Sequence, residues 1–286
     1  MHAPTRPDTA VGVSTPFDTA EPRNFGPVVI SVPHAGRDYP SDIGELLAVE
    51  LWQARALEDR LADLLIEGFE SDGHSAVVAR TPRLMIDLNR AETDLVLHQS
   101  PGTRPTWRAR GGLGVIPDRL HGVGNLWFTA PDAAVLAVRL ATVHRPYHAA
   151  VERLLARAAA KHGYAILIDL HSMPPLVAPH RGDVVIGDLH GRSSDGCLVT
   201  AASTCLAQNR LRVTYNKPYA GGYILERHGR PASGVHALQL EIDRRLYLDA
   251  TLSKPGTGLE AMRRVVHDLA GSLANVGPRA LPIAAE

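Results

Sequence analysis

Apolar residues recur along the chain in two patterns, which predict strands and helices in alternation. Short runs rich in β-branched residues predict strands at residues 27–32, 76–80, 84–88, 164–170, 184–187, 211–215 and 236–242. Apolar residues three or four positions apart predict helices at residues 43–69, 131–161 (in two pieces), 198–209 and 258–274. Strands that alternate with helices are typical of an α/β fold.

The segment from residue 95 to residue 128 shows neither pattern. It is rich in Gly, Pro and Arg, and a loop this long in a compact domain is usually functional or disordered. We expect a single domain at residues 25–275, preceded by a flexible segment at residues 1–24 and followed by a flexible tail at residues 276–286.

Charge and composition narrow the class of partner. The chain has 286 residues, with 30 Lys and Arg against 30 Asp and Glu, so no overall field favours nucleic acid or an anionic membrane. No apolar run approaches the roughly 20 residues that span a bilayer, and because the first 25 residues lack a continuous apolar stretch we do not expect them to act as a signal peptide. Two cysteines make a disulfide framework unexpected and the cytoplasm the default compartment. A small-molecule substrate fits these features best.

Four short polar motifs lie at or near the C-terminal ends of apolar runs. They are SVPHAG ending at Gly36, DLNR at Asp87–Arg90, IDLHS ending at Ser172 and QLEID ending at Asp243. In an open α/β sheet, ligands bind in the crevice outside the carboxyl ends of the strands, so groups far apart in sequence can converge there. The motifs supply histidines, carboxylates and an arginine, which are the parts of a metal-assisted hydrolase.

Two histidines suggest a metal site. His34 and His171 each directly follow an apolar run, so both imidazoles should emerge at the same edge of the sheet. A catalytic zinc usually takes three protein ligands, and two His with one carboxylate is a known set. Glu58, Asp59 and Asp63 are the candidates for the third ligand. Asp59 and Asp63 would share one helical face at i, i+4, although that face could also be merely solvated.

Two further carboxylates lie close to these motifs. Glu241 is surrounded by apolar residues, and a buried carboxylate is costly unless it is paired or its pKa is raised. It could act as a general base or form a salt bridge with Arg244 or Arg245. Asp169 lies two residues before His171, and on an extended strand it would share a face with that imidazole and could orient it.

The DLNR motif offers a different chemistry. Arg90 presents a planar fork that can bind a carboxylate through two hydrogen bonds, and Asn89 adds an orienting amide. The same tetrapeptide could equally form a structural ion pair. The sequence alone therefore leaves open whether it is a substrate clamp.

Taken together, these motifs resemble the N-formylglutamate amidohydrolases, from about residue 25 to residue 250. The residues that carry the resemblance, in chain order, are His34 in SVPHAG, Asp59 with Asp63, Arg83 with DLNR at 87–90, HRPYH at 144–148, DLHS at 169–172, Gly187-Asp188, KPY at 217–219 with GGY at 221–223, and QLE at 239–241. Each motif alone would be weak evidence, but their agreement in order is specific.

The resemblance implies a fold and an activity. The fold would be three-layer α/β/α with a mixed, mostly parallel sheet, similar to zinc-dependent exopeptidases (phosphorylase/hydrolase-like). The activity would be hydrolysis of N-formyl-L-glutamate to formate and L-glutamate with Zn²⁺ or another divalent metal. His34, Asp59 and His171 would be the metal ligands and Glu241 the general base. Zinc lowers the pKa of a bound water to about 7, which makes such a reaction possible at neutral pH.

The remaining expected roles concern the substrate and the oxyanion. His148 and Arg145 would stabilise the oxyanion, unless they have a purely structural place on a helix. The expected substrate-binding residues are Arg83, Asn89, Arg90, His144, Gly221 and Gly222. Two other functions stay open: a related amidase for another N-acyl or N-formimidoyl acidic amino acid, and a catalytically silent, metal-bound binding protein.

Overall fold

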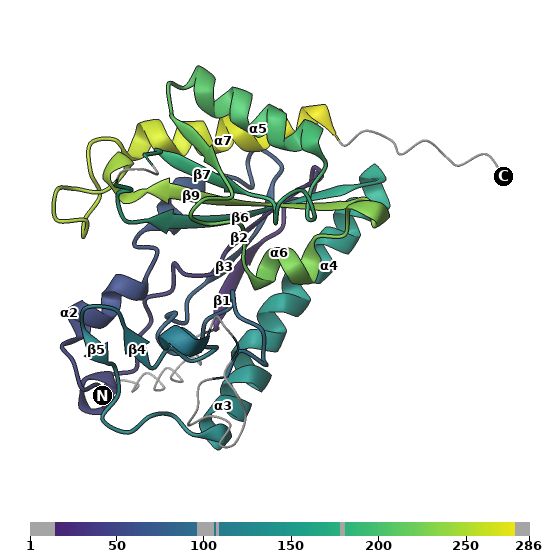
Figure 1. Ribbon diagram of the computed structural model, residues 1–286. Helices are drawn as coiled ribbons and strands as arrows, with labels where there is room; N and C mark the ends of the chain where they lie inside the picture. Colours follow the sequence, from purple (N-terminus) through teal and green to yellow (C-terminus); the bar gives the residue numbers. More distant parts are fainter. Residues whose placement is uncertain (1–14, 96–105, 107–108, 178–180, 278–286) are drawn as a thin grey trace, which may run out of the picture.

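A single mixed sheet forms the centre of the protein. The structure is a computed structural model that describes residues 15–95, 106, 109–177 and 181–277. The strands of the sheet are β1 (Phe17–Ala20), β2 (Val28–Val32), β3 (Ser75–Ala79), β6 (Ala165–Met173), β7 (Val184–Gly187), β8 (Val213–Tyr215) and β9 (Val235–Asp243). Within the described residues their order is β1-β3-β2-β6-β9-β7-β8 (Figure 1). Parallel pairs join β3, β2, β6 and β9, and also β7 and β8, whereas β1–β3 and β7–β9 are antiparallel.

Helices cover both faces of the sheet. The long ones are α4 (Arg145–His162), α5 (Gly196–Gln208) and α7 (Leu259–Val276), and the short α6 (Tyr223–His228) follows β8. α5 and α7 lie on one face, and α4 and α6 lie on the other (Figure 1). The prediction of a three-layer α/β/α fold with a mostly parallel sheet is therefore confirmed. No helix among the described residues has both the length and the apolar character needed to cross a membrane.

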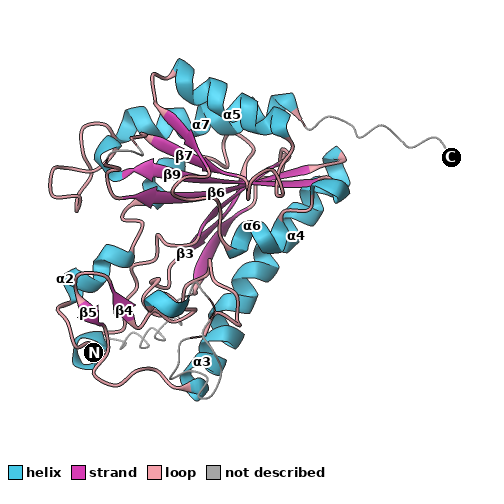
Figure 2. Cartoon of the chain, in the orientation of Figure 1, coloured by secondary structure: helices cyan, strands magenta, loops and turns pink. Residues whose placement is uncertain are grey.

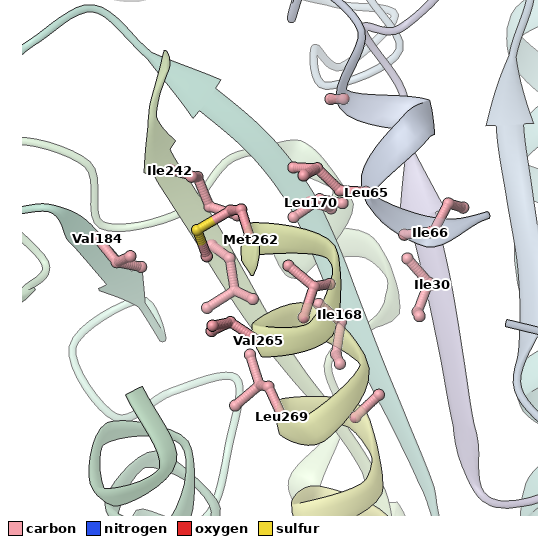
Figure 3. Packing of buried hydrophobic residues seen from close by; sticks show 14 of the residues in the cluster. Ile30, Leu65, Ile66, Ile168, Leu170, Val184, Ile242, Met262, Val265 and Leu269 are labelled. Carbon is pink, nitrogen blue, oxygen red and sulfur yellow. The ribbon is translucent and has the colours of Figure 1, made fainter. Parts of the chain in front are cut away.

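The central strands are apolar on both sides because each side is covered by helices. Ile30 and Ile168 belong to the core beneath α7, where Met262 and Val265 pack (Figure 3). Leu167, which points the opposite way from Ile168, packs in the core beneath α4. This arrangement explains the nearly continuous apolar runs that predicted the strands, and it fixes the strand ends from which the polar motifs extend.

A smaller lobe lies beside the sheet (Figure 2). It contains α1 (Ile43–Leu46), α2 (Leu51–Ala54), the two-stranded β4 (Arg119–Leu120) and β5 (Gly124–Asn125), and α3 (Ala133–Arg139), which continues through a π-helical turn into α4. Its own apolar core includes Leu57, Ile86 and Ile116. Part of the segment predicted to be irregular thus has structure, while residues 96–105, 107 and 108 lie outside the described residues.

The single helix predicted at residues 43–69 is wrong. The chain forms α1, α2 and two turns of 3₁₀ helix, at Arg55–Leu57 and Ala62–Ile66. Between these turns the backbone N–H of Asp59 donates to the carbonyl of His34 at 2.9 Å, and Leu61 adopts a left-handed conformation with φ 58°. The apolar period arises because Leu57 and Leu65 are buried in two different cores. The helical face expected to carry Asp59 and Asp63 together does not exist.

Three other expectations need correction. Residues 84–88 are not a strand but a buried series of turns, because Ile86 and its neighbours pack in the lobe rather than pair with the sheet. Residues 17–20, which were expected to be flexible, form β1 and pair with β3. The helix α6 was not predicted. Most of the two terminal segments that were expected to be flexible, namely residues 1–14 and 278–286, lies outside the described residues.

Candidate metal centre and active site

Two buried histidines lie side by side at the carboxyl end of the central strands. His34 follows the end of β2, and His171 lies within the neighbouring parallel strand β6. Their side chains are about 3% exposed, and their ring centroids are 4.7 Å apart. Adjacent parallel strands therefore bring the two imidazoles together.

Asp59 completes this group from the turn between the two 3₁₀ segments. Its Oδ2 lies 2.8 Å from His171 Nδ1 and 3.4 Å from His34 Nδ1. One potential ligand atom from each of the three residues lies within 4.8 Å of the others. We call His34, Asp59 and His171 the His–Asp–His cluster.

The other two candidates for the third ligand have different partners. The buried carboxylate of Glu58 accepts hydrogen bonds from Tyr39 and Arg60. Asp63 accepts two hydrogen bonds of 2.7 Å from Arg37. The alternatives left open by the sequence are thereby separated, because only Asp59 of the three contacts the histidines.

A carboxylate also lies behind each imidazole. His34 Nε2 is 2.8 Å from Asp87 Oδ1, and His171 Nε2 is 2.9 Å from Asp169 Oδ2. Metal-ligating histidines commonly donate their second N–H to a carboxylate in this way, which fixes the tautomer and the ring orientation. With Nε2–H donating outward, each Nδ1 is free to coordinate. The contact between Asp169 and His171 that the sequence suggested is present, while the contact between Asp87 and His34 was not expected.

The chemistry of the cluster fits a divalent metal. His34 Nδ1 is buried and has no hydrogen-bond partner among the described residues, although buried polar atoms are normally satisfied. Two imidazole nitrogens with one carboxylate oxygen form a donor set that zinc uses at catalytic sites. A metal would satisfy the lone pair of His34 Nδ1 and neutralise the carboxylate.

The charges of the cluster are strongly coupled. Burial disfavours the charged form of Asp59, but its hydrogen bond with His171 and the nearby imidazole of His34 hold its pKa well below the usual value. Burial likewise opposes a charge on His171, yet the carboxylates of Asp169 and Asp59 raise the pKa of that imidazole well above the usual value. The metal-free protein therefore favours the protonated form of His171, and a metal ion that binds Nδ1 competes with that proton.

The second oxygen of Asp59 is held from outside the cluster. Ser172 Oγ and Arg244 Nη2 each donate to Asp59 Oδ1 at 3.3 Å, and Arg244 Nε donates to Ser172 Oγ at 3.1 Å. Arg244 also donates to the carbonyl of Glu58. These contacts leave Asp59 Oδ2 directed at the two imidazoles. Arg244 was considered from the sequence only as a partner of Glu241.

Glu241 lies on β9 directly opposite His171 of β6 in the strand register. Burial raises the pKa of Glu241 to about 7, with the charge of His171 opposing the rise and that of Asp59 adding to it. The alternative salt bridges are not formed, because Arg244 binds Asp59 and Arg245 binds Asp243. A carboxylate with this pKa beside a metal-ligand cluster is suited to proton transfer near neutral pH.

Arg83 is the predicted substrate residue whose charge faces the cluster. Its Nε donates to Asp87 Oδ2 at 2.8 Å, and within the described chain its two terminal nitrogens have no hydrogen-bond partner. Burial opposes its charge, but the carboxylates of Asp87, Asp59 and Glu241 raise its pKa. The guanidinium is thus fixed at one end and has donors available at the other.

The other predicted substrate residues around DLNR have intramolecular contacts. Arg90 donates to the carbonyls of Leu113 and Asn89 at 2.8 and 3.0 Å. Gly221 has φ +123°, and a Cβ on Gly222 would lie 2.3–2.5 Å from the amide atoms of Asn89. The close backbone approach expected at the two glycines therefore brings the chain against the Asn89 side chain.

The HRPYH motif forms a second histidine group, which adjoins the DLNR segment through His144. His144 Nε2 donates to the carbonyl of Arg90 at 2.9 Å, and His148 Nδ1 is 3.0 Å from His228 Nε2. We call His144, His148 and His228 the three-histidine cluster. Arg145 is exposed and forms a two-point ion pair with Glu92. Neither Arg145 nor His148 has a described contact with the His–Asp–His cluster, in contrast to their expected role.

Comparison with known proteins agrees with this geometry. A model of the N-formylglutamate amidohydrolase family matches residues 26–248. The chain belongs to this family. The resemblance seen in its motifs is confirmed over nearly the same span.

Individual relatives extend over most of the chain. N-formylglutamate deformylases from Pseudomonas aeruginosa and Pseudomonas putida are 32% identical over 262 residues and 30% identical over 239 residues. These matches cover 86% and 79% of this chain and 92% and 83% of the relatives. A crystal structure of an N-formylglutamate amidohydrolase from Ralstonia eutropha JMP134 is similar, with a TM-score of 0.84, 29% identity, and coverage of 92% of this chain and 98% of that one. A structure from Agrobacterium tumefaciens with a TM-score of 0.65 and 20% identity, covering 92% and 96% of the two chains, shares the fold.

Proposed function

We propose that this protein hydrolyses N-formyl-L-glutamate to formate and L-glutamate in a metal-dependent reaction. The observation that carries the proposal is the convergence of the His–Asp–His cluster with Glu241 at the carboxyl end of the sheet. The family match and the relatives named as N-formylglutamate deformylases support the substrate.

His34 Nδ1, Asp59 Oδ2 and His171 Nδ1 would hold the metal, for which Zn²⁺ is the best candidate and another divalent ion the alternative. When bound, such an ion supplies Lewis-acid polarisation of the formyl oxygen and lowers the pKa of a coordinated water. Asp87 and Asp169 keep the two imidazoles in the coordinating tautomer, and Arg244 with Ser172 keeps the carboxylate in place.

Glu241 acts as the general base in this proposal. It accepts a proton from the water that adds to the formyl carbon. As the C–N bond breaks, the Glu241 carboxyl group returns the proton to the nitrogen of the leaving L-glutamate, and formate is released. A pKa of about 7 allows the side chain to serve in both directions at neutral pH.

Arg83 would bind a carboxylate of the substrate. Its terminal nitrogens offer a planar pair of donors that matches a carboxylate group, and its Nε is fixed by Asp87. We assign no direct contact with the reacting atoms to Arg145, which is paired with Glu92, or to His148, which is paired with His228. Burial holds the pKa of His148 well below its usual value, which disfavours a positive charge on that imidazole.

The test is formate release from N-formyl-L-glutamate by protein that has been stripped of metal and then reloaded with zinc. We expect the activity to disappear with the metal and to return when zinc is added. Parallel assays of N-acetyl- and N-formimidoyl-L-glutamate identify a related amidase if one of these is the better substrate. Absence of turnover on the whole panel by the zinc-loaded protein would contradict the proposal and favour a binding protein.

A further inference from the structure

Two buried amide side chains connect the start of α6 to Glu241. The backbone N–H of Ile224 donates to Asn89 Oδ1 at 2.9 Å. Asn89 Nδ2 donates to Gln239 Oε1 at 3.4 Å and also lies 3.5 Å from Asp169 Oδ2 and 3.1 Å from His171 Nε2. Gln239 Nε2 in turn donates to Glu241 Oε1 at 2.9 Å. Asn89 and Gln239 are 5% and 4% exposed, so water does not compete for these contacts. We call these hydrogen bonds the amide chain.

The direction of the amide chain is fixed at its first member. A backbone N–H can only donate, so the amide of Asn89 must turn its oxygen toward Ile224 and its nitrogen away. Gln239 then receives a donor and must present its oxygen to Asn89, which leaves its own nitrogen facing Glu241. The orientation of an amide is assigned from its hydrogen-bond network, and here one immovable donor determines both amides.

The fold leaves the amide chain little freedom. Gly222 has no side chain, and an added Cβ would lie 2.3 Å from Asn89 Oδ1, so the turn before α6 closes directly on the Asn89 amide. On β9, Gln239 and Glu241 are two residues apart and point to the same face of the sheet. The register places Gln239 opposite Asp169 and Glu241 opposite His171. Gln239 therefore lies beside Glu241 because alternate residues of a strand share one face of the sheet.

We propose that Gln239, oriented by Asn89, is a positioning residue that holds Glu241 by one oxygen and leaves the other for the attacking water. The proposal rests on the role of Glu241 as general base. Glu241 Oε1 accepts from Gln239, whereas Oε2 has no hydrogen-bond partner within the described part of the chain. With a donor fixed on Oε1, the carboxylate cannot rotate away from the geometry in which Oε2 reaches the water. The assignment also gives Asn89 a role different from the substrate contact expected from the sequence.

The test compares Gln239→Met, which keeps the length of the side chain but removes the donor, with wild type at saturating zinc. We expect kcat for N-formyl-L-glutamate to fall about 10- to 100-fold, because a reacting group that is slightly misplaced loses rate on that scale. KM and the zinc content should change little, since the described hydrogen bonds of Gln239 are with Asn89 and Glu241 and not with Arg83 or the proposed metal ligands. A decrease confined to kcat separates loss of positioning from general damage.

Two further variants keep the test decisive. The control is His236→Leu, at the opposite end of the same strand. It removes a hydrogen bond that the buried His236 accepts from the backbone N–H of Asp195, and it should leave kcat unchanged. Gln239→Asn retains an amide but is too short to reach both partners, so it should reproduce the loss of kcat even if the Met variant does not fold. Wild-type kcat in the folded Gln239 variants would overturn the proposal.

The direction of the amide chain is testable in a double-mutant cycle. Asn89→Asp offers oxygen on both sides, which forces Gln239 to turn its nitrogen toward residue 89 and its oxygen toward Glu241. In samples shown to hold stoichiometric zinc, we expect Asn89→Asp to lower kcat more in the wild-type background than in Gln239→Met, because part of its effect acts through Gln239. The rest of its effect arises from the contacts of residue 89 with His171 and Asp169, which are the same in both backgrounds. Equal effects in both backgrounds would overturn the role of Asn89. If Glu241→Gln retained full activity, the assignment of Glu241 as the general base would fail. This result is distinguishable from a failure of the roles proposed for Gln239 and Asn89, which would leave Glu241→Gln inactive.

Discussion

Buried histidines gather at two places in this molecule, and their surroundings differ. In the His–Asp–His cluster, carboxylates of Asp59, Asp87 and Asp169 contact the imidazoles. In the three-histidine cluster, the described partners are a backbone carbonyl and a second imidazole. Burial lowers the pKa of His228 to about 3, with Arg227 adding to the shift, whereas neighbouring carboxylates outweigh burial at His171 and raise its pKa.

The difference shows that the surroundings of an imidazole, more than its burial, decide what it can do. The carboxylates around the first cluster would compensate the charge of a cation bound there, which a buried metal site requires. In the second cluster no carboxylate is among the described hydrogen-bond partners, and burial lowers the pKa of each imidazole. Instead, His144 binds the carbonyl of Arg90 and supports the loop that carries Asp87 and Asn89. The His–Asp–His cluster is therefore suited to binding a metal, whereas the three-histidine cluster is suited to supporting the neighbouring loop.

The largest loss of activity is expected when Glu241, the carboxylate beside the His–Asp–His cluster, is made neutral. Glu241→Gln keeps the size of the side chain but cannot accept a proton, so kcat should fall by roughly 10²–10⁴. The zinc content, measured on the same samples, should stay stoichiometric because Glu241 is not a proposed ligand. Near wild-type turnover would show that the base is another group.

The contrast between the two clusters also marks what the sequence could predict. Strands β2, β6 and β9 were predicted because their apolar runs are long and covered on both faces, and their order in the sheet brings His34, His171 and Glu241 together. Periodicity failed around Asp59, where two separate cores share one apparent helical pattern. Hydrophobic periodicity cannot detect the irregular turn that positions the carboxylate of Asp59.

Contacts between distant segments were the second limit. His148 and Arg145 occur in a motif as prominent as that of His171, yet α4 directs them to His228 and Glu92. The contacts of Arg244 with Ser172 and Asp59 were not predicted, because these residues adjoin Arg244 only after β6 and β9 pair. In both cases the residue type was visible in the sequence, but the partner was set by tertiary packing.

The next largest effect is expected at Arg83, the proposed substrate-binding residue near the His–Asp–His cluster. Arg83→Lys keeps the charge but loses the planar fork, and lost charge-assisted hydrogen bonding is worth about 1.5–3 kcal/mol. We expect kcat/KM for N-formyl-L-glutamate to fall, and its advantage over N-formyl-L-glutamine to narrow. An undiminished preference for the acid in the variant would place carboxylate recognition elsewhere.

A smaller effect should follow from loosening the carboxylate ligand. Arg244→Lys cannot reach both Asp59 and Ser172 as the guanidinium does, and loss of a contact behind a metal ligand typically costs about 10- to 100-fold in metal affinity. Arg245→Lys is the matched control, because Arg245 is exposed and pairs with Asp243. Zinc dissociation constants from a competing chelator give the comparison. Equal affinities in the two variants would exclude Arg244 as a support for Asp59.

The smallest effect is a pH dependence of stability that has opposite sign in the two clusters. His228 has a folded pKa of about 3, so below its unfolded pKa of about 6.5 the unfolded state binds more protons and the native state loses stability. The raised pKa of His171 in the metal-free protein does the reverse: its contribution is complete below about pH 6.5 and is lost as pH rises through the folded pKa.

Urea unfolding of metal-free protein measures this opposition. Between pH 7.5 and pH 5.5, the destabilisation caused by His228→Gln should shrink by about 1 kcal/mol, while that caused by His171→Gln should grow. Shifts of the same sign in the two variants would show that the clusters do not differ in charge as described.

The central claim is that the carboxylate-lined cluster, and not the three-histidine cluster, holds the metal used in the reaction. Metal analysis of wild type, His171→Ala and His148→Gln, with formate release measured on the same samples, tests it most directly. We predict stoichiometric zinc and activity in wild type, loss of both in His171→Ala, and stoichiometric zinc in His148→Gln. Full zinc occupancy in His171→Ala, or loss of zinc in a folded His148→Gln protein, would contradict the claim.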